Sequence, residues 1–470
     1  MSDLRNFNNF TMLKMFNLDE KNIQNFKVYD VPEVDDNGKV IRYILNIDIK
    51  LVDLRPRCSH CDSEDIVIKD YVLKKLKHAT LVNKESIINY HARRYRCKFC
   101  QKTFYEHNPF SLSSMRYTMN TVYNVLDDLR AETETFASTA KRHHLSVNTV
   151  IKIFDDYVDI SRSKLPEILC IDEVYAFKSR NSKYVCVLLD YETQEIVDLL
   201  PSRRMEHLRS YFYSIPKEER NNVKIVSIDM WHSYREITRT QLPNAVCALD
   251  KFHVFQEFSR NFTKVRIQEM NQYKQNNDKP YHELTSSEKA LRYQRDINYY
   301  LLKKFNWLLF KTDPIYSDPN YERRYNHKLK GRYNYHELKC KILDASHKLL
   351  EIYNLQTHLR LFYDLKYDEA KYKINQLIER FKNSNIPEMN DFANTLINWK
   401  NEIVNSFLIV GKNEKKISNA IIENRNKSIK TIKRNGNGYT NWDRFRNRVM
   451  YSLNKSAAYR LYRIEKDQKR

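Results

Sequence analysis

Ile168-Leu-Cys-Ile171 is the first of five short apolar runs that lie between residues 167 and 255. The other four are Tyr184-Val-Cys-Val-Leu-Leu189, Glu195-Ile-Val-Asp-Leu-Leu200, Val223-Lys-Ile-Val-Ser-Ile228 and Ala245-Val-Cys-Ala-Leu249. Each run is too short for a typical helix and is bounded by polar residues, which favours β-strands. The sequence therefore predicts an α/β unit with a buried sheet over residues 167–255.

Two aspartates directly follow two of these runs. Asp172 comes after Ile171, and Asp229 comes after Ile228. Adjacent strands that end in carboxylates can bring the acids within reach of shared ions, as in two-metal sites. A strand-terminal aspartate can also simply cap the next turn, so the pattern leaves both interpretations open.

A third acid, Glu423, lies in the expected helix Ser418-Asn-Ala-Ile-Ile-Glu-Asn-Arg-Asn-Lys-Ser-Ile-Lys430. Basic residues follow it at Lys427, Lys430, Lys433 and Arg434. An acid in so basic a helix is either a salt-bridge partner or a metal ligand beside bound phosphates. The sequence alone does not separate these two roles.

The character of the chain changes on both sides of the α/β unit. Residues 1–57 alternate in strand fashion, residues 116–163 have a helical pattern, and residues 256–410 look almost wholly helical. Thr285-Ser-Ser-Glu288 has the spacing of a capping box at the start of a helix. Residues 411–450 contain the Glu423 helix, and residues 451–470 form a basic tail.

Two C-x-x-C pairs, Cys58 with Cys61 and Cys97 with Cys100, lie within residues 58–105. Each such turn aims two thiolates at one point about 2.3 Å from a zinc ion, and two turns complete a closed, structural tetrahedron. The separation of the pairs exceeds the usual ~15–20 residues of a zinc ribbon, but a longer hairpin can still bring them together. The sequence therefore predicts a structural Zn²⁺ site.

Other roles for the cysteines and nearby histidines remain open. The four thiols could be buried reduced cysteines or a redox pair, and His60 and His107 are possible but unneeded ligands. Cys340 is isolated in the sequence. The remaining cysteines lie in apolar runs and are expected to be core thiols: Cys170, Cys186 and Cys247.

Residues 135–154 have the rhythm of a helix-turn-helix. The small Ala140 allows two helices to cross closely, and Ser146 is placed to cap the second helix. A short helical hairpin without a DNA-binding role would show the same rhythm. On the DNA-binding interpretation, the side chains expected to contact DNA are Lys141, Arg142, Ser146, Asn148, Thr149 and Lys152.

Composition excludes several classes of protein. Only 5 of the 470 residues are glycine, so neither G-x-G-x-x-G nor G-x-x-x-x-G-K-[ST] can be assembled, and dinucleotide-binding and P-loop folds are excluded. No apolar run approaches the ~18 residues that cross a bilayer. The start of the chain lacks the pattern of a signal peptide, so we expect a cytoplasmic protein with reduced thiols.

The formal net charge of +22 indicates a polyanionic partner, most simply nucleic acid. Codon bias toward lysine and asparagine is the alternative explanation. Residues 401–470, however, hold 17 Lys or Arg and 6 Asp or Glu, so half of the excess lies in the last 70 residues. This localisation favours a DNA track around and after Glu423.

Together these segments resemble an insertion-sequence transposase of the DDE type, in the ISL-three family. The matching segments run in the family's order from about residue 58 to 450. They are Cys58 to Cys61, Arg94-Tyr-Arg-Cys-Lys-Phe-Cys100, Ile171-Asp-Glu-Val174, Lys183-Tyr-Val-Cys-Val-Leu-Leu-Asp190, Ser227-Ile-Asp-Met-Trp231, Leu249-Asp-Lys-Phe-His-Val254, Ser418 to Glu423 with Asn426, and Gly438-Tyr-Thr-Asn-Trp-Asp-Arg-Phe-Arg446.

The resemblance implies a multidomain α+β fold. Its parts are a β-rich N-terminal region (1–57), a zinc-finger domain (58–105), a helix-turn-helix domain (116–163) and an RNase H-like α/β catalytic core. The core occupies residues 167–255 and ends with the Glu423 helix (411–450). A large all-helical insertion (256–410) interrupts it, and a basic tail (451–470) follows.

The resemblance also implies roles for particular residues. Asp172, Asp229 and Glu423 are the expected catalytic triad and Mg²⁺ (or Mn²⁺) ligands, with Asp250, His253 and Asn426 in support. Cys58, Cys61, Cys97 and Cys100 would bind Zn²⁺. Further DNA contacts are expected from Arg425, Lys427, Lys430, Lys433 and Arg434.

The expected activity is Mg²⁺-dependent cleavage of DNA at terminal inverted repeats, followed by strand transfer into target DNA. The expected partners are these DNAs and further copies of the chain in a synaptic complex, in a bacterial, nucleoid-associated setting. Two alternatives remain: a catalytically inactive DNA-binding regulator derived from a transposase, and an RNase H-like nuclease or resolvase.

Overall fold

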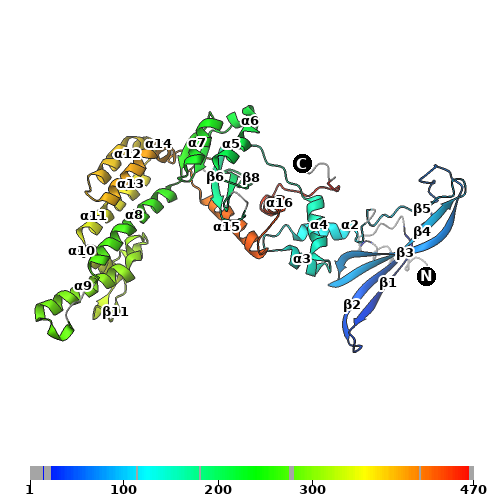
Figure 1. Cartoon of the computed structure of the whole chain (residues 1–470), viewed down its shortest axis with the longest axis horizontal. Coiled ribbons are helices and arrows are strands. Elements are labelled where there is room, and N and C mark those ends of the chain that lie inside the picture. Colours follow the sequence, from blue (N-terminus) through cyan, green and yellow to red (C-terminus); the bar gives the residue numbers. More distant parts are fainter. Residues whose placement is uncertain are drawn as a thin grey trace. The chain divides into compact units, whose positions relative to one another are not determined.

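The computed structural model describes residue 14 and residues 23–112, 115–178, 182–274, 280–411 and 414–464. The chain forms two compact units (Figure 1). The first contains residues 1–162 and 427–470, and the second contains residues 163–426. Among the described residues, no helix combines the length and the apolar character needed to cross a bilayer.

A five-stranded sheet opens the first unit. Its strands are β1 (Ile23–Val34), β2 (Val40–Leu51), β3 (Ile66–Leu81), β4 (Lys84–Cys97) and β5 (Thr103–Tyr105), in the order β1-β2-β4-β3 with β5 on β4. Alternate residues of β2 and β4, such as Ile47, Ile49, Ile88 and Tyr90, are buried on one face. Because β2 pairs with β4, the domain boundary expected at residue 57 falls inside one continuous sheet.

The helices α2 (Met119–Asp128), α3 (Phe136–Arg142), α4 (Val147–Tyr157) and α16 (Trp442–Leu453) share a second core in this unit. The Arg448 side chain on α16 is fully buried and donates to the carbonyl oxygens of Ala131 (2.9 Å) and Glu134 (2.7 Å). A buried guanidinium needs such acceptors to offset its lost hydration. Helix α16, of which we expected residues 442–450 in the catalytic core and 451–453 in the basic tail, therefore packs with the helix-turn-helix segment.

A second five-stranded sheet lies in the second unit, and all five predicted strands are confirmed. They are β6 (Ile168–Val174), β7 (Val185–Asp190), β8 (Ile196–Leu200), β9 (Ile225–Ile228) and β10 (Val246–Leu249), in the order β10-β9-β6-β7-β8. The β6-β7-β8 part is antiparallel, and β9 and β10 run parallel to β6. The intervening helices are α5 (Met205–Tyr213), α6 (Lys217–Asn221) and α7 (His232–Gln241).

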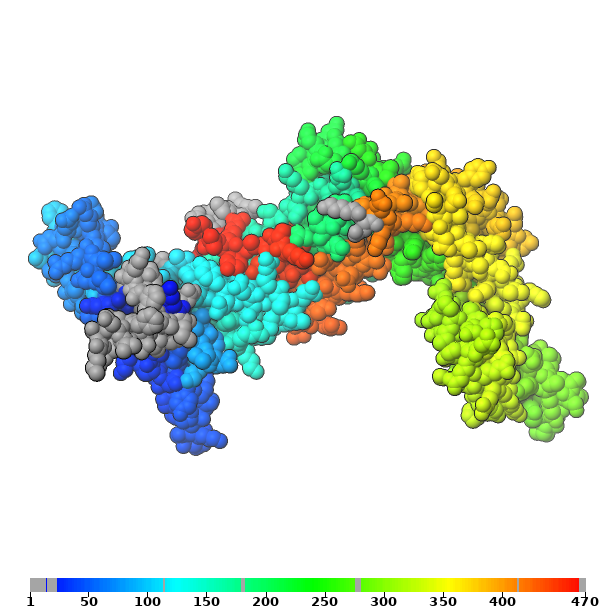
Figure 2. Space-filling model, turned by 180° about the vertical axis from the view of Figure 1, so that it is seen from behind, coloured from blue at the N-terminus to red at the C-terminus, as the bar shows by residue number. Residues whose placement is uncertain are grey.

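Long helices follow the sheet. They are α8 (Lys251–Gln272), α9 (Ser286–Lys304), α10 (Tyr335–Asp344), α11 (His347–Tyr363), α12 (Tyr367–Lys382), α13 (Pro387–Asn398) and the short α14 (Lys400–Asn405). The predicted capping box at the start of α9 is confirmed, since Thr285 and Glu288 each bond the other's backbone N–H. The segment from α9 to α13 forms one continuous body, coloured green to yellow (Figure 2).

Among the described residues, the expectation that 256–410 are all-helical is wrong at a hairpin over residues 324–333 and at residues 409–410. A hairpin of β11 (Arg324–Asn326) and β12 (Gly331–Tyr333) separates α9 from α10. The Asn326 side chain closes its turn by accepting from the backbone N–H groups of Lys328 and Leu329, both at 3.1 Å. Such an Asx turn competes with helix formation. The short pair β13 (Ile409–Val410) and β14 (Lys415–Lys416) precedes α15 (Ala420–Asn435).

Candidate active site and metal centres

The register of β6 and β9 explains why two of the predicted carboxylates meet. Cys170 pairs with Ser227 in this parallel ladder, so the residues two positions later, Asp172 and Asp229, lie at the same level. One oxygen from each of Asp172, Glu173 and Asp229 lies within 4.8 Å of the other two. We call this trio the first carboxylate group.

A second group forms beside the next strand. Leu249 of β10 pairs with Ile228 of β9, which brings Asp250 next to the end of β9. Asp250 is the N-cap residue of α8, His253 lies in the first turn of α8, and Glu423 lies in the first turn of α15. Ligand atoms of these three residues lie within 4.8 Å of one another.

The three residues of the expected triad thus divide between the two groups. Glu423 lies with Asp250 and His253 rather than with Asp172 and Asp229. The groups are nevertheless close enough to interact electrostatically, because the Glu423 charge contributes to a raised pKa of Asp172. All six residues therefore belong to one acidic site.

Burial and mutual repulsion disfavour the charged carboxylates. Burial, with the charges of Glu173, Glu423 and Asp250, raises the pKa of Asp172 to about 7. Burial, with the charges of Glu173 and Asp172, raises the pKa of Asp229 to about 8. Divalent cations such as Mg²⁺ bind carboxylate oxygens and would offset this repulsion. The oxygen donors of the site therefore fit Mg²⁺.

Asn426 connects α15 to β6. Its side-chain Nδ2 donates to Oδ2 of Asp172 at 2.8 Å, and Asn426 is only 6% exposed. Asn426 follows Glu423 by three residues, so both side chains lie on one face of the helix. The hydrogen bond thereby fixes the position of the Asp172 carboxylate relative to α15.

Asn419 is a further connection, which sequence reasoning missed although it belongs to the Ser418–Glu423 motif. Its Oδ1 accepts from the Ser227 hydroxyl on β9 at 2.5 Å, and its side chain is fully buried. The backbone N–H of Glu423 donates to the Asn419 carbonyl at 2.9 Å. The start of α15, and with it Glu423, is therefore attached directly to β9 of the second sheet.

Glu173 and Arg203 were also missed. The Arg203 guanidinium forms an ion pair with Glu173 and lies 4.0 Å from the ring centroid of Trp231 and 4.4 Å from that of Tyr184. The Tyr234 hydroxyl donates to the other carboxylate oxygen of Glu173 at 3.2 Å. For Glu173, the sequence offered one signal, which is its position directly after Asp172. For Arg203 the sequence offered no signal, because only folding brings this residue to β6.

His253 has the character of a neutral imidazole. Burial lowers the pKa of His253, although the charges of Glu423 and Glu173 oppose the effect. Its Nε2 is buried and has no hydrogen-bond partner among the residues that the structure describes. A neutral imidazole with an open nitrogen beside two carboxylates can accept a proton or bind a metal ion.

The four predicted zinc ligands converge in the first unit. Sγ–Sγ distances are 3.6 Å for Cys58 with Cys100 and 3.6 Å for Cys61 with Cys97, and all four sulfurs lie within 4.8 Å of one another. A tetrahedral Zn²⁺ with ~2.3 Å bonds places its sulfurs about 3.8 Å apart. The long β3–β4 hairpin, in which Ile66 pairs with Cys97, accounts for the unusual spacing.

Backbone N–H groups also donate hydrogen bonds to two of these sulfurs. The N–H of Cys100 donates to Sγ of Cys97 at 3.5 Å, and the N–H of His60 donates to Sγ of Cys58 at 3.5 Å. The N–H groups of Cys100 and Phe99, together with the thiols of Cys61 and Cys100, lower the pKa of Cys97, whereas burial and the neighbouring thiols raise the pKa of Cys61. Among the described residues, neither His60 nor His107 belongs to the cluster. The four thiols therefore fit a structural Zn²⁺.

The isolated cysteines differ from these four. Cys170, Cys186 and Cys247 are buried in β6, β7 and β10, which confirms that they are core thiols. Cys340 is exposed on α10.

The helix-turn-helix segment has the expected elements. Ala140 of α3 is buried in the core, and Ser146 caps α4 by accepting from the N–H of Thr149 at 3.2 Å. His144 adopts a left-handed conformation (φ 53°) in the turn. Lys141, Asn148 and Lys152 are exposed. These positions leave the outer face of α4 accessible.

Three other residues expected to contact DNA are engaged within the protein. Arg142 forms ion pairs with Asp128 at 2.7 Å and Glu134 at 2.5 Å. The Thr149 hydroxyl bonds that of Ser146 at 2.8 Å. Arg425 donates from Nε to the Gln194 carbonyl at 2.9 Å. Along the rest of α15, Lys427, Lys430 and Arg434 are exposed and Lys433 is half-buried.

Comparisons with known proteins agree with this arrangement. The sequence model of the DDE transposase family ISL3, described as "Transposase", matches residues 169–449. The model described as "zinc-finger of transposase IS204/IS1001/IS1096/IS1165" matches residues 54–100.

A curated relative is the "Transposase for insertion sequence element IS1001" of Bordetella parapertussis, which is 26% identical over 281 residues. The match covers 59% of this chain and 59% of the relative's length. The family match spans the acidic site, and the zinc-finger match contains all four clustered cysteines. The chain therefore belongs to the ISL3 (ISL-three) family of DDE-type insertion-sequence transposases.

Proposed function

We propose that this chain cuts DNA at the terminal inverted repeats of an insertion sequence and joins the freed ends to target DNA, by Mg²⁺-dependent phosphoryl transfer. The observation that carries the proposal is the convergence of Asp172 on β6, Asp229 just after β9 and Glu423 on α15 into one partly buried acidic site. Transposases of this family act on DNA, which agrees with the +22 net charge.

We further propose that β6–β10 form the RNase H-like core, completed by α15 after a long insertion. The strand order, with β6 at the centre of a mixed sheet, supports this assignment. The insertion begins with α8, directly after β10, and it packs into the same hydrophobic core as the sheet. The site is thereby built from residues far apart in sequence on one rigid core.

Asp172, Asp229 and Glu423 would hold Mg²⁺, and Glu173, Asp250 and His253 are placed to complete the ligand set. Bound Mg²⁺ would lower the pKa of an attacking water and stabilise the leaving 3′-oxygen. Hydrolysis breaks the P–O3′ bond and leaves a 3′-OH and a 5′-phosphate. The 3′-OH then attacks a phosphodiester of target DNA, which releases a target 3′-OH.

The chain's own residues position this site. Asn426 orients Asp172, Asn419 attaches the start of α15 to β9, and Arg203 partly neutralises Glu173. We propose that the zinc finger and α4 bind the terminal repeats and that the cations of α15 contact phosphates. Assembly into a homo-oligomer would bring two ends together.

A cleavage assay tests the proposal. Labelled duplexes carrying the inverted repeats beside the gene are incubated with full-length protein and Mg²⁺. Asp172→Asn, Asp229→Asn and Glu423→Gln should each abolish nicking. Glu192→Gln, at an exposed position after β7, is the matched control and should leave nicking unchanged. Cutting that survives Asp172→Asn would overturn the assignment.

Two further results would favour the alternatives. Specific binding of the ends without cleavage by the wild type would identify a DNA-binding regulator. Equal cutting of branched junctions and terminal repeats would identify an RNase H-like nuclease or resolvase.

A further inference from the structure

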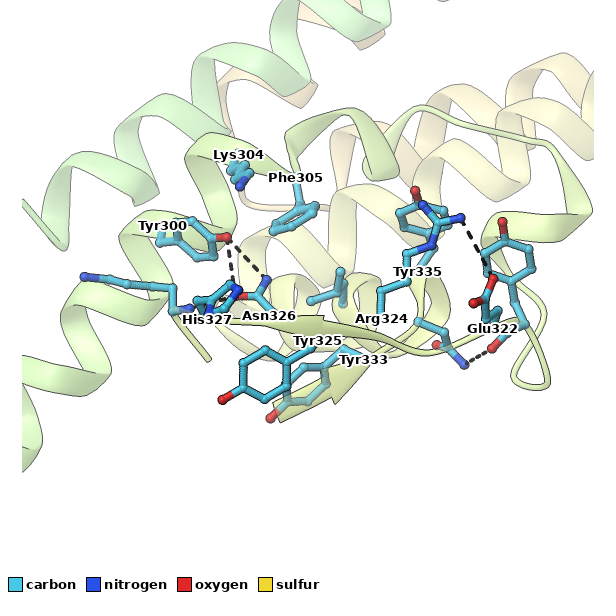
Figure 3. Close-up of a pocket in the computed structure, with 14 residues that line it drawn as sticks. Tyr300, Lys304, Phe305, Glu322, Arg324, Tyr325, Asn326, His327, Tyr333 and Tyr335 are labelled. Carbon is cyan, nitrogen blue, oxygen red and sulfur yellow. Dashed lines mark hydrogen bonds and ion pairs between the residues drawn. The ribbon is translucent and has the colours of Figure 1, made fainter. Parts of the chain in front are cut away.

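A cavity of about 410 Å³ lies between the end of α9, the β11–β12 hairpin and the start of α10 (Figure 3). Six aromatic residues line it: Tyr300, Phe305, Tyr321, Tyr325, Tyr333 and Tyr335. Its volume falls in the range of about 300–1,000 Å³ that is typical of ligand sites. None of its lining residues belongs to the acidic site, the zinc site or the helix-turn-helix segment.

The walls of the cavity are held in place. Tyr335 stacks on Tyr321 with centroids 5.6 Å apart and packs edge-on against Trp307 at 5.3 Å. The Tyr300 hydroxyl and the Asn326 amide bond each other at 3.3 to 3.4 Å, which fastens the hairpin turn to α9 (Figure 3). A preformed cavity loses little conformational entropy when it binds a ligand.

One ring of the lining is available for stacking. Tyr325 is 55% exposed, and His327 packs against it edge-on, at 5.0 Å and 84°. The exposed ring therefore offers an apolar face on which a planar group can stack.

The residues that line the cavity carry a net positive charge, which favours an anionic ligand. Lys304 and Lys328 line it, and neither forms an ion pair with any residue that the structure describes. Glu322 is the one acid among the described lining residues, and its Oε2 lies 3.9 Å from Nη2 of Arg324. This ion pair leaves the charges of Lys304 and Lys328 unbalanced. Residues 321–341 contain seven Lys or Arg and two acids.

We propose that this cavity binds an unpaired nucleotide of DNA, with its base on the ring of Tyr325 and its phosphate near Lys304 and Lys328. Aromatic rings combined with cations are the usual means of holding single-stranded nucleic acid. The faces of a base are covered in a duplex and become available only when the nucleotide leaves the stack. The choice of DNA rests on the proposed function, in which the chain cuts and joins DNA ends.

Binding of single-stranded DNA tests the proposal. Fluorescence anisotropy of a labelled oligothymidylate is measured with full-length, zinc-loaded protein and no added Mg²⁺. Tyr325→Ala should weaken binding about tenfold, whereas Tyr325→Phe should retain it. The double variant Lys304→Gln/Lys328→Gln should also weaken it and reduce its salt dependence.

The matched control is Tyr372→Ala on α12, where the tyrosine is 78% exposed. Equal affinities of Tyr325→Ala and Tyr372→Ala would overturn the proposal. Competition by poly-glutamate as strong as by unlabelled oligothymidylate would also overturn it, because the site would then recognise an acidic peptide.

Photo-cross-linking locates the contact directly. Single-stranded DNA containing 5-iododeoxyuridine should form adducts in the peptide that contains Tyr325, and adducts confined to residues 116–163 would refute the site. Neither readout requires cleavage. Cross-links in a protein that never cuts DNA would therefore support the cavity while refuting the proposed catalysis, and Mg²⁺-dependent cleavage without these cross-links would refute the cavity alone.

Discussion

Asn426 donates a 2.8 Å hydrogen bond to Asp172, a residue 254 positions earlier in the chain. The bond joins the helix that carries Glu423 to the strand that carries Asp172, so one amide links two members of the proposed triad.

Asn426→Ala should reduce cleavage about 10–100-fold without preventing folding, because residues that orient metal ligands typically have effects of this size. The apparent Mg²⁺ affinity, measured as the midpoint of a titration of the cleavage rate, should fall as well. Asn424→Ala, at an exposed position on the same helix, is the control. Equal rates for the two variants would show that the hydrogen bond has no part in positioning Asp172.

Asp229→Asn should raise the melting temperature of the metal-free protein, because it removes one of three crowded carboxylates. Folding raises the pKa of Asp229 to about 8 from an ordinary 3.8, so its contribution to stability is complete below about pH 4 and is lost as the pH rises through 8. The gain from Asp229→Asn should therefore be large at pH 8 and absent at pH 4. Calorimetry at both pH values measures it.

The same variant should lose the stabilisation that added Mg²⁺ gives to the wild type. A variant that is destabilised at pH 8, or that keeps the full Mg²⁺ response, would contradict a metal-binding role for Asp229.

Arg203→Gln should lower stability by about 1–3 kcal/mol, because it leaves the half-buried Glu173 without its cation. The Trp231 emission should also change, since the guanidinium lies 4.0 Å from that ring. Denaturant titration and tryptophan fluorescence measure the two effects. Arg209→Gln, at an exposed position on α5, is the control and should change neither the stability nor the Trp231 emission.

Cys97→Ser should reduce bound zinc and weaken binding to terminal-repeat DNA, because the thiolate both binds the metal and holds the β3–β4 hairpin end in place. Elemental analysis of the purified protein measures the zinc. Cys340→Ser, at the exposed isolated cysteine, should retain the full zinc content. Zinc content that does not change in Cys97→Ser would refute the structural site.

Lys152→Gln should weaken binding to terminal-repeat DNA and lower its salt slope by about 1, with no change in stability, because the side chain is exposed on α4. Ser146→Ala should instead cost about 1 kcal/mol of stability through loss of the helix cap. Affinity and melting temperature measured on both variants separate the two roles. Unchanged DNA affinity in Lys152→Gln would remove α4 from the proposed interface.

The amino-acid sequence alone predicted the strands, the helix caps and the cysteine pairs, because each depends on residues close together in the chain. The five strands of the second sheet, the Ser146 cap, the Thr285 capping box and the paired cysteines all depend on residues within a few positions of one another. Short-range hydrogen bonding and burial periodicity suffice to predict such features.

Only the tertiary structure decided which distant residues meet. Pairing of β9 and β10 alongside β6 places Asp229 with Asp172, and Asp250 beside them, because register fixes which side chains stand level. Packing of α15 and α8 against the sheet places Glu423 with Asp250 and His253, and the fold also brings Arg203 into contact with Glu173. Contacts of this kind arise from packing between elements, and no periodicity along the chain records them.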